Sequence, residues 1–131
     1  MNNYIYEGYG IILPSSVDQK QGWYYVKVDD SISSYYKWFY SKAFKQWYPC
    51  MNGCHITFIA GEKDDRIIQL EEMKDYIEKE IHFIYDNTIY TNGRAFWINC
   101  TSKDLDEIRN KLGLRKRDNY HITLGNIKNV R

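Results

Sequence analysis

The stretch His121-Ile122-Thr123-Leu124 repeats the start of an earlier stretch, His55-Ile56-Thr57-Phe58-Ile59-Ala60. Both stretches are short and rich in β-branched and aromatic residues, which is typical of β-strands. Side chains along a strand alternate between its two faces, so each histidine shares a face with the threonine two residues later. The sequence therefore predicts two strands that each present an imidazole and a hydroxyl on one side.

Each of these strands closes a unit of strand, helix and strand. Apolar and aromatic residues recur at helical spacing in the first unit, and Gly113 ends the helix of the second. The expected elements are a strand at Trp23–Val28, a helix at Ser31–Trp47, a strand at Cys54–Ala60, a strand at Ala95–Cys100, a helix at Ser102–Leu112 and a strand at Tyr120–Leu124. We therefore expect one domain, residues 1–131, with two related units at about 22–60 and 94–125.

The remaining segments complete the expected domain. An extended run is predicted at Tyr4–Leu13, a helix at Asp65–Glu78 and a strand at Ile81–Tyr85. Asn92-Gly93 is a turn signal of the kind found in β-hairpins. Thr101-Ser102-Lys103-Asp104 has the pattern of a capping box at the start of the last helix.

Composition limits the kinds of partner. The chain has 131 residues and a formal net charge of +1, which argues against a binder of long nucleic acids. Positive charge is nevertheless concentrated between Arg109 and Arg131, where Asp118 is the single acid. Such a region can attract a small anionic substrate, or it can be an ordinary solvated surface. Aromatic residues make up 17% of the chain, and they can serve either as core or as stacking surfaces for bases.

The cysteines and the hydropathy pattern indicate the compartment. Cys50, Cys54 and Cys100 are an odd number without the spacing of a disulfide framework, so free thiols in a reducing cytoplasm are expected. No stretch approaches the roughly 18 apolar residues that a membrane span needs, so no membrane partner is expected. Cys50, Cys54 and His55 could be read as part of a zinc site, but no second ligand pair matches them, and no metal or other cofactor is expected.

Two histidines and two hydroxyls suit the cleavage of a phosphodiester bond. The reaction removes a proton from the attacking oxygen and delivers one to the leaving oxygen, and a histidine can perform either task near neutral pH. Threonine hydroxyls can donate hydrogen bonds to the non-bridging oxygens, where charge develops. The predicted catalytic residues are His55, Thr57, His121 and Thr123, whereas His82 lacks a hydroxyl at the second position after it and is interpreted as structural.

The paired His-x-Thr motifs resemble those of the 2H phosphoesterase superfamily. Within it, the aromatic run Tyr35-Tyr36-Lys37-Trp38-Phe39-Tyr40 and the two motif strands are most similar to the phage anti-CBASS cyclic-oligonucleotide phosphodiesterases. The resemblance implies an α+β fold with two pseudo-symmetric lobes, in which antiparallel sheets form a central cleft and helices pack outside. It also implies metal-independent cleavage of 3′–5′ bonds in cyclic di- and trinucleotide messengers such as cGAMP, in the host-cell cytoplasm, as a means of immune evasion.

Further substrate contacts are expected outside the motifs. Tyr9 lies between two glycines that would let a ligand approach its ring, and Trp97 alternates with apolar residues on an expected central strand. Arg115, Lys116 and Arg117 precede the second motif strand and could steer anions, or they could form an ordinary solvated loop. Two other functions remain open: cleavage of 2′,3′-cyclic phosphate RNA ends or 2′–5′ oligoadenylate, and a non-catalytic module that sequesters a nucleotide.

Overall fold

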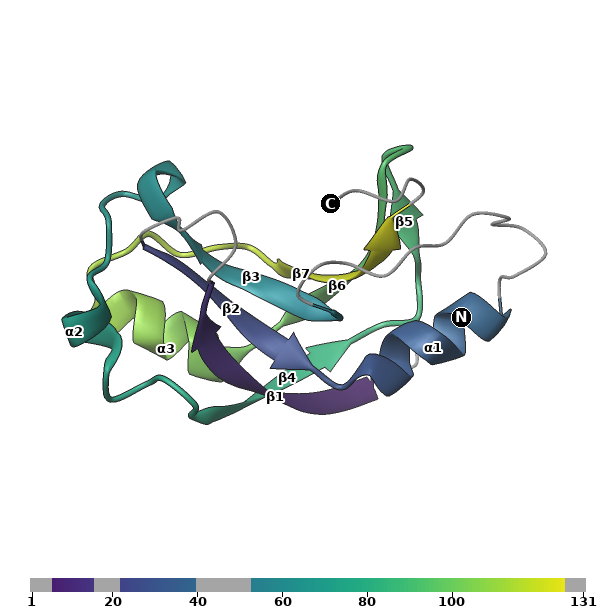
Figure 1. Ribbon diagram of the computed structural model, residues 1–131, viewed down its shortest axis with the longest axis horizontal. Helices are drawn as coiled ribbons and strands as arrows, with labels where there is room; N and C mark the ends of the chain where they lie inside the picture. Colours follow the sequence, from purple (N-terminus) through teal and green to yellow (C-terminus); the bar gives the residue numbers. More distant parts are fainter. Residues whose placement is uncertain (1–5, 16–21, 40–52, 127–131) are drawn as a thin grey trace.

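The computed structural model describes residues 6–15, 22–39 and 53–126 (Figure 1). Strands dominate this part of the chain, and the helices are short. In chain order the elements are β1 (Tyr6–Pro14), β2 (Trp23–Val28), α1 (Asp30–Phe39), β3 (His55–Ala60), the 3-10 helix η2 (Gly61–Lys63), α2 (Leu70–Met73), β4 (Glu80–Tyr85), β5 (Tyr90–Thr91), β6 (Ala95–Thr101), α3 (Lys103–Lys111) and β7 (Tyr120–Asn126).

The strands form one antiparallel sheet that closes on itself. Its order is β4-β1-β2-β3-β7-β6-β5, and β4 also pairs with β6 through Ile84 opposite Thr101 and Tyr85 opposite Cys100. This second pairing closes six of the strands into a barrel. The seventh strand, β5, pairs with a different part of β6, on the same edge that β4 uses. Closure removes the free edges that an open sheet would expose.

The expected two-lobed α+β fold with a central cleft is wrong, because the structure is a closed six-stranded antiparallel barrel with few helices. The difference arises at β4, which pairs with both β1 and β6 and thereby joins the two halves into one sheet. The two motif strands consequently pair side by side, as β3 and β7, within that sheet. They do not belong to separate lobes that face each other.

Alternating side chains fill the barrel. Every second residue of the paired strands is buried, and the motif isoleucines Ile56 and Ile122 are both 0% exposed. The strand residues of the core are Ile12, Tyr24, Val26, Val28, Ile56, Phe58, Ile59, Ile81, Phe83, Phe96, Ile98, Cys100, Tyr120, Ile122 and Leu124. Because these residues point inward, the intervening histidines and threonines of the motifs lie on the outer surface of the barrel.

Helices α1 and α3 lie toward opposite ends of the molecule (Figure 1). The predicted first helix is confirmed from Asp30 to Phe39, and the rest of its expected range falls in residues 40–52, outside the described residues. Helix α3 begins one residue later than the expected capping box. Its N-cap is Ser102, whose Oγ accepts a hydrogen bond from the Leu105 N–H, whereas the Asp104 carboxylate accepts one from the His82 N–H.

The helix expected at Asp65–Glu78 is mostly absent. Only Leu70–Met73 is helical, because polar groups of the residues just before it form hydrogen bonds with residues far away in the sequence. The Ile68 carbonyl accepts a hydrogen bond from the Tyr24 hydroxyl, and the Asp65 carboxylate accepts one from the Arg115 N–H. Glu78, at the other end, has a φ of 65°, which no α-helix accommodates.

None of the helices in the described ranges has the length and hydrophobicity that a membrane-spanning helix requires.

Candidate functional site

The two His-x-Thr motifs lie on neighbouring strands and form a four-residue cluster on the outer surface. In the antiparallel pairing of β3 and β7, His55 is opposite Thr123 and Ile56 is opposite Ile122. Continuing the same register by one residue places Thr57 opposite His121. Each histidine therefore has a threonine beside it on its own strand and another across from it. The structure thus brings together all four predicted catalytic residues.

The strands on either side of this cluster repeat the same arrangement. On β2, Tyr25 pairs with Thr57, and on β6, Trp97 pairs with Thr123, so an aromatic residue flanks each motif threonine. Both pairings change register just beyond that point, which leaves Phe58 and Leu124 as the extra residues. Bulges of this kind occur preferentially beside active sites, where they redirect side chains. The neighbouring strands β2 and β6 thus flank the motif strands with equivalent pairings.

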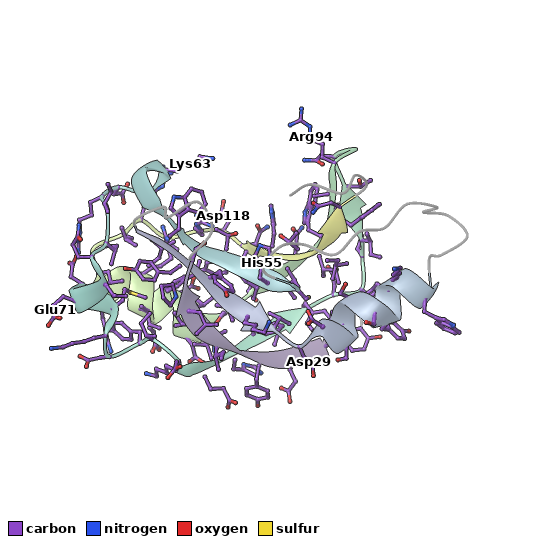
Figure 2. All side chains as sticks on the ribbon, viewed as in Figure 1. Asp29, His55, Lys63, Glu71, Arg94 and Asp118 are labelled. Atoms are coloured by element: carbon purple, nitrogen blue, oxygen red, sulfur yellow. The ribbon has the colours of Figure 1, made fainter. Side chains whose placement is uncertain are left out.

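The two histidines lie close together on neighbouring strands. His55 and His121 are diagonal neighbours across an antiparallel pair, a relation that corresponds to roughly 7–8 Å between backbone positions. A cavity of about 220 Å³ opens beside His121, lined by Thr57, Arg117, Asn119, Tyr120, His121 and Thr123. His55, at the start of β3 near the centre of the view in Figure 2, does not line this cavity but is paired with Thr123, which does.

One ring nitrogen of His55 forms a hydrogen bond with the backbone. Nδ1 lies 2.8 Å from the Gly53 carbonyl oxygen, which can only accept a hydrogen bond, so Nδ1 carries the proton and Nε2 is left with a lone pair. The edge of Tyr25 lies against the imidazole, with ring centroids 6.0 Å apart. Burial lowers the pKa of His55, and the hydrogen bond to Gly53 partly offsets this effect. These features favour a neutral imidazole that can accept a proton.

His121 has a different environment. Its ring stacks on Trp97 with centroids 5.4 Å apart, and Trp97 in turn stacks on Tyr90 of β5 at 6.2 Å. Burial lowers the pKa of His121, and the positive charge of Arg117 lowers it further. Trp97 is therefore the one additional predicted substrate-binding residue that contacts a motif histidine.

Arg117 brings a cation to the cavity and is held there by a buried ion pair. Its Nη2 lies 3.6 Å from Asp64 Oδ2, and its Nη1 donates a hydrogen bond to the Thr57 carbonyl at 3.4 Å. Asp64 also accepts a hydrogen bond of 2.7 Å from Arg109, and both of these side chains are almost completely buried. Burial alone would raise the pKa of Asp64, but the hydrogen bonds from Arg109 and from the Ala60 N–H hold it below its ordinary value.

The other sequence-based candidates lie elsewhere. Tyr9 is 54% exposed on β1 and contacts His82, two strands away from β3. Arg115 is exposed and uses its backbone to bind Asp65 and Arg109, and Lys116 is exposed as well. None of these three side chains lines the 220 Å³ cavity. His82 Nε2 lies 3.1 Å from a carboxylate oxygen of Glu7 on the surface.

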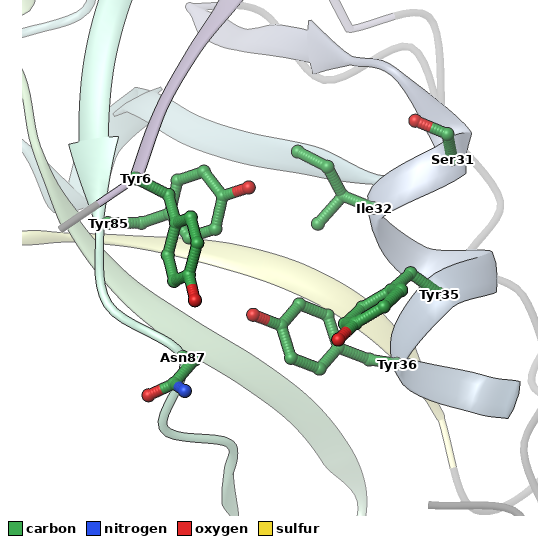
Figure 3. A pocket seen from close by; sticks show the side chains of 7 residues that line it. All are labelled: Tyr6, Ser31, Ile32, Tyr35, Tyr36, Tyr85 and Asn87. Atoms are coloured by element: carbon green, nitrogen blue, oxygen red, sulfur yellow. The ribbon is translucent and has the colours of Figure 1, made fainter. Parts of the chain in front are cut away.

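A larger cavity, of about 430 Å³, lies between α1 and the ends of β1 and β4 (Figure 3). Four tyrosines surround it, and Figure 3 shows their rings gathered around the open space. The residues that line it are Tyr6, Ser31, Ile32, Tyr35, Tyr36, Tyr85 and Asn87. None of the motif residues is among them, so this cavity is separate from the His-x-Thr cluster.

The cysteines show no metal-binding arrangement in the described part of the chain. Across residues 6–15, 22–39 and 53–126, no three His, Cys, Asp or Glu side chains gather where they could hold an ion. Cys50 falls outside these ranges, whereas Cys54 and Cys100 are buried free thiols. Burial raises the pKa of Cys100 to about 12, with a smaller contribution from Cys54, so this thiol is unreactive at neutral pH.

Two residues near the motifs were not singled out by the sequence pattern. Asn119 lines the cavity, and Asn99 pairs with His121 from β6. Neither belongs to a recurrent motif, and only the pairing of β6 with β7 places Asn99 beside the histidine. Arg117 stands in the basic run that was expected to steer anions, but the sequence could not distinguish it from its two basic neighbours.

Comparisons of this chain with models of protein families, with curated proteins and with solved structures found no match.

Proposed function

We propose that this protein is a phosphodiesterase that cleaves a small nucleotide with His55 and His121 as its acid–base pair. The observation that carries the proposal is the β3–β7 register, because it gathers two imidazoles and two hydroxyls on one exposed surface beside an arginine. Acid–base catalysis by positioned histidines contributes typically 10²–10⁴-fold to a rate. A hydroxyl aimed at developing negative charge can add about 3 kcal/mol of stabilisation.

The chemistry can be written with the chain's own groups. Nε2 of His55 takes the proton of a ribose 2′-OH, whose oxygen then bonds to the adjacent phosphorus. The bond from phosphorus to the 5′ oxygen breaks, and His121 donates a proton to that leaving oxygen. The product is a 2′,3′-cyclic phosphate, which water can open to a 3′-phosphate through the same groups in reversed roles. Bound phosphate favours the protonated form of His121, since an opposite charge nearby raises the pKa of an imidazole.

The proposed substrate class is a cyclic di- or trinucleotide with 3′–5′ bonds. Its support is the similarity of the motifs to the phage anti-CBASS phosphodiesterases of the 2H superfamily. Arg117 provides a cation for the phosphate, and the stacked rings of Trp97 and Tyr90 extend from His121 as a surface on which a base can lie. On this proposal the protein removes a signalling nucleotide of the host CBASS defence.

The proposal is tested by incubating EDTA-treated protein with a panel of nucleotides and identifying the products by mass spectrometry. The panel contains cyclic dinucleotides, cyclic trinucleotides, a 2′,3′-cyclic mononucleotide and 2′–5′ oligoadenylate. We expect cleavage of a cyclic di- or trinucleotide, and a loss of about 10²–10⁴-fold in kcat for His55→Ala and for His121→Ala. His82→Ala is the matched control, because this third histidine pairs with Glu7 away from the motifs.

Each contrary result has a definite meaning. Cleavage restricted to the 2′,3′-cyclic mononucleotide or to oligoadenylate would replace the proposed substrate while keeping the histidine mechanism. Recovery of bound but intact ligand would identify a sequestering module. Loss of activity in EDTA, or full activity in both motif-histidine variants, would refute the mechanism.

A further inference from the structure

The two motif histidines also differ in the hydrogen bonding of their rings. Nδ1 of His55 has the Gly53 carbonyl as its acceptor, which fixes the ring and its tautomer. His121 stacks on Trp97, but within the described ranges no hydrogen bond to either of its ring nitrogens is formed. Stacking restrains the plane of a ring without determining which nitrogen carries the proton. His121 therefore lacks a hydrogen-bond acceptor equivalent to the Gly53 carbonyl beside His55.

An unused acceptor lies on the neighbouring strand. Asn99 pairs directly with His121 between β6 and β7, and its Oδ1 is buried without a hydrogen-bond partner. It is the one such side-chain atom among the described residues. Leaving a buried acceptor unsatisfied costs about 1–3 kcal/mol, so an unpaired amide oxygen at this position needs a reason. Directly opposed residues in an antiparallel pair have Cβ atoms roughly 4.5–5.5 Å apart, which is within reach of an amide and an imidazole.

We infer that Asn99 is the positioning residue of His121: its Oδ1 accepts the hydrogen bond of His121 Nδ1–H and thereby turns Nε2 toward the phosphate. The arrangement reproduces, with a side-chain amide on β6, what the Gly53 carbonyl does for His55. Both imidazoles then present Nε2 to the outer side of the paired strands β3 and β7. The catalytic consequence rests on the proposed function, whereas the tautomer of His121 does not.

The inference is tested first by the protonation state of the ring. In nitrogen-15-labelled protein above the pKa of His121, long-range proton–nitrogen spectra should show Nδ1–H and an unprotonated Nε2. In Asn99→Leu the proton should move to Nε2 or be shared between the nitrogens. In Asn99→Asp the Nδ1–H form should persist, and the pKa of His121 should rise because a carboxylate faces it, opposing the nearby charge of Arg117. Asn110→Leu, at an exposed position of α3, is the matched control and should change neither property.

The second readout is kinetic. With a cleaved substrate in hand, Asn99→Leu should lower kcat by roughly 10²-fold with little change in KM, because a misoriented acid affects the transition state more than binding. Asn99→Asp should recover part of that loss, and Asn110→Leu should match the wild type. Nε2–H in the wild-type His121, or an unchanged tautomer in Asn99→Leu, would overturn the inference even in an active enzyme. A protein that cleaves nothing but shows the expected tautomers would instead refute the proposed function alone.

Discussion

His55 and His121 reach the same surface of the barrel in unlike electrostatic surroundings. Burial lowers the pKa of both imidazoles, but Arg117 contributes only to the shift of His121. A depressed pKa means that the folded protein favours the neutral ring, so the acid side of the activity profile should fall below the ordinary histidine value of about 6.5. One cation thus distinguishes two residues that the sequence presents as equivalent.

Removing that cation should raise the pKa of His121. In Arg117→Gln the positive charge no longer opposes protonation of the ring, so His121 should titrate at a higher pH while His55 is almost unaffected. The measurement is a titration of both imidazoles by NMR, with His55 as the internal reference. Lys116→Gln is the matched control, since Lys116 is exposed and does not line the cavity. Equal shifts of the two histidines, or a downward shift of His121, would contradict this account.

At the scale of elements, the buried pair of Arg109 and Asp64 holds α3 against the end of β3. Arg109 comes from α3 and donates hydrogen bonds to the Phe58 carbonyl, to Asp64 and to the Arg115 carbonyl. The pair therefore fixes the segment that carries Arg117. The sequence predicted α3 and both motif strands, but it placed Arg109 in a basic surface region. Nothing local marks a helical arginine as buried when its partner stands 45 residues away.

Removing the carboxylate should destabilise the whole protein. Asp64→Ala leaves the Arg109 guanidinium buried without its counter-ion, a change that costs about 3–5 kcal/mol in comparable buried pairs. Urea unfolding should show a loss of this size, whereas Asp75→Ala, at an exposed position, should change the free energy of unfolding by less than about 0.5 kcal/mol. Similar losses of unfolding free energy in both variants would mean that the ion pair between Arg109 and Asp64 does not stabilise the fold.

At the scale of the whole molecule, β4 decides between an open and a closed sheet. It lies between β1 and β6, and its Phe83 is completely buried in the common core. Because closure makes one core out of both units, the barrel should unfold as a single cooperative body. Separate lobes, in contrast, would each have a core and could unfold independently.

Weakening β4 should therefore destabilise the motif strands to the same extent as the rest. Phe83→Ala should cost about 3–5 kcal/mol, and circular dichroism and the NMR signals of His55 and His121 should report the same transition in urea. Ile84→Ala, one residue along β4 at a partly exposed position, is the control and should cost less than about 1 kcal/mol. If the histidine signals kept their wild-type midpoint in Phe83→Ala, the barrel would not be one cooperative unit.

The local features could be predicted directly from the residues: the two motif strands, the strand–helix–strand order of each unit, and the face that each histidine shares with its threonine. Period-two alternation and helical spacing express these features within a few neighbouring residues, so they can be read without knowledge of the fold. The folded barrel was needed to show that β4 closes the sheet, that β3 and β7 are adjacent, and that Arg117 and Asn99 lie near His121. Those outcomes depend on pairings between distant segments, and the energies that choose among such pairings come from the shared core and not from any single stretch of chain.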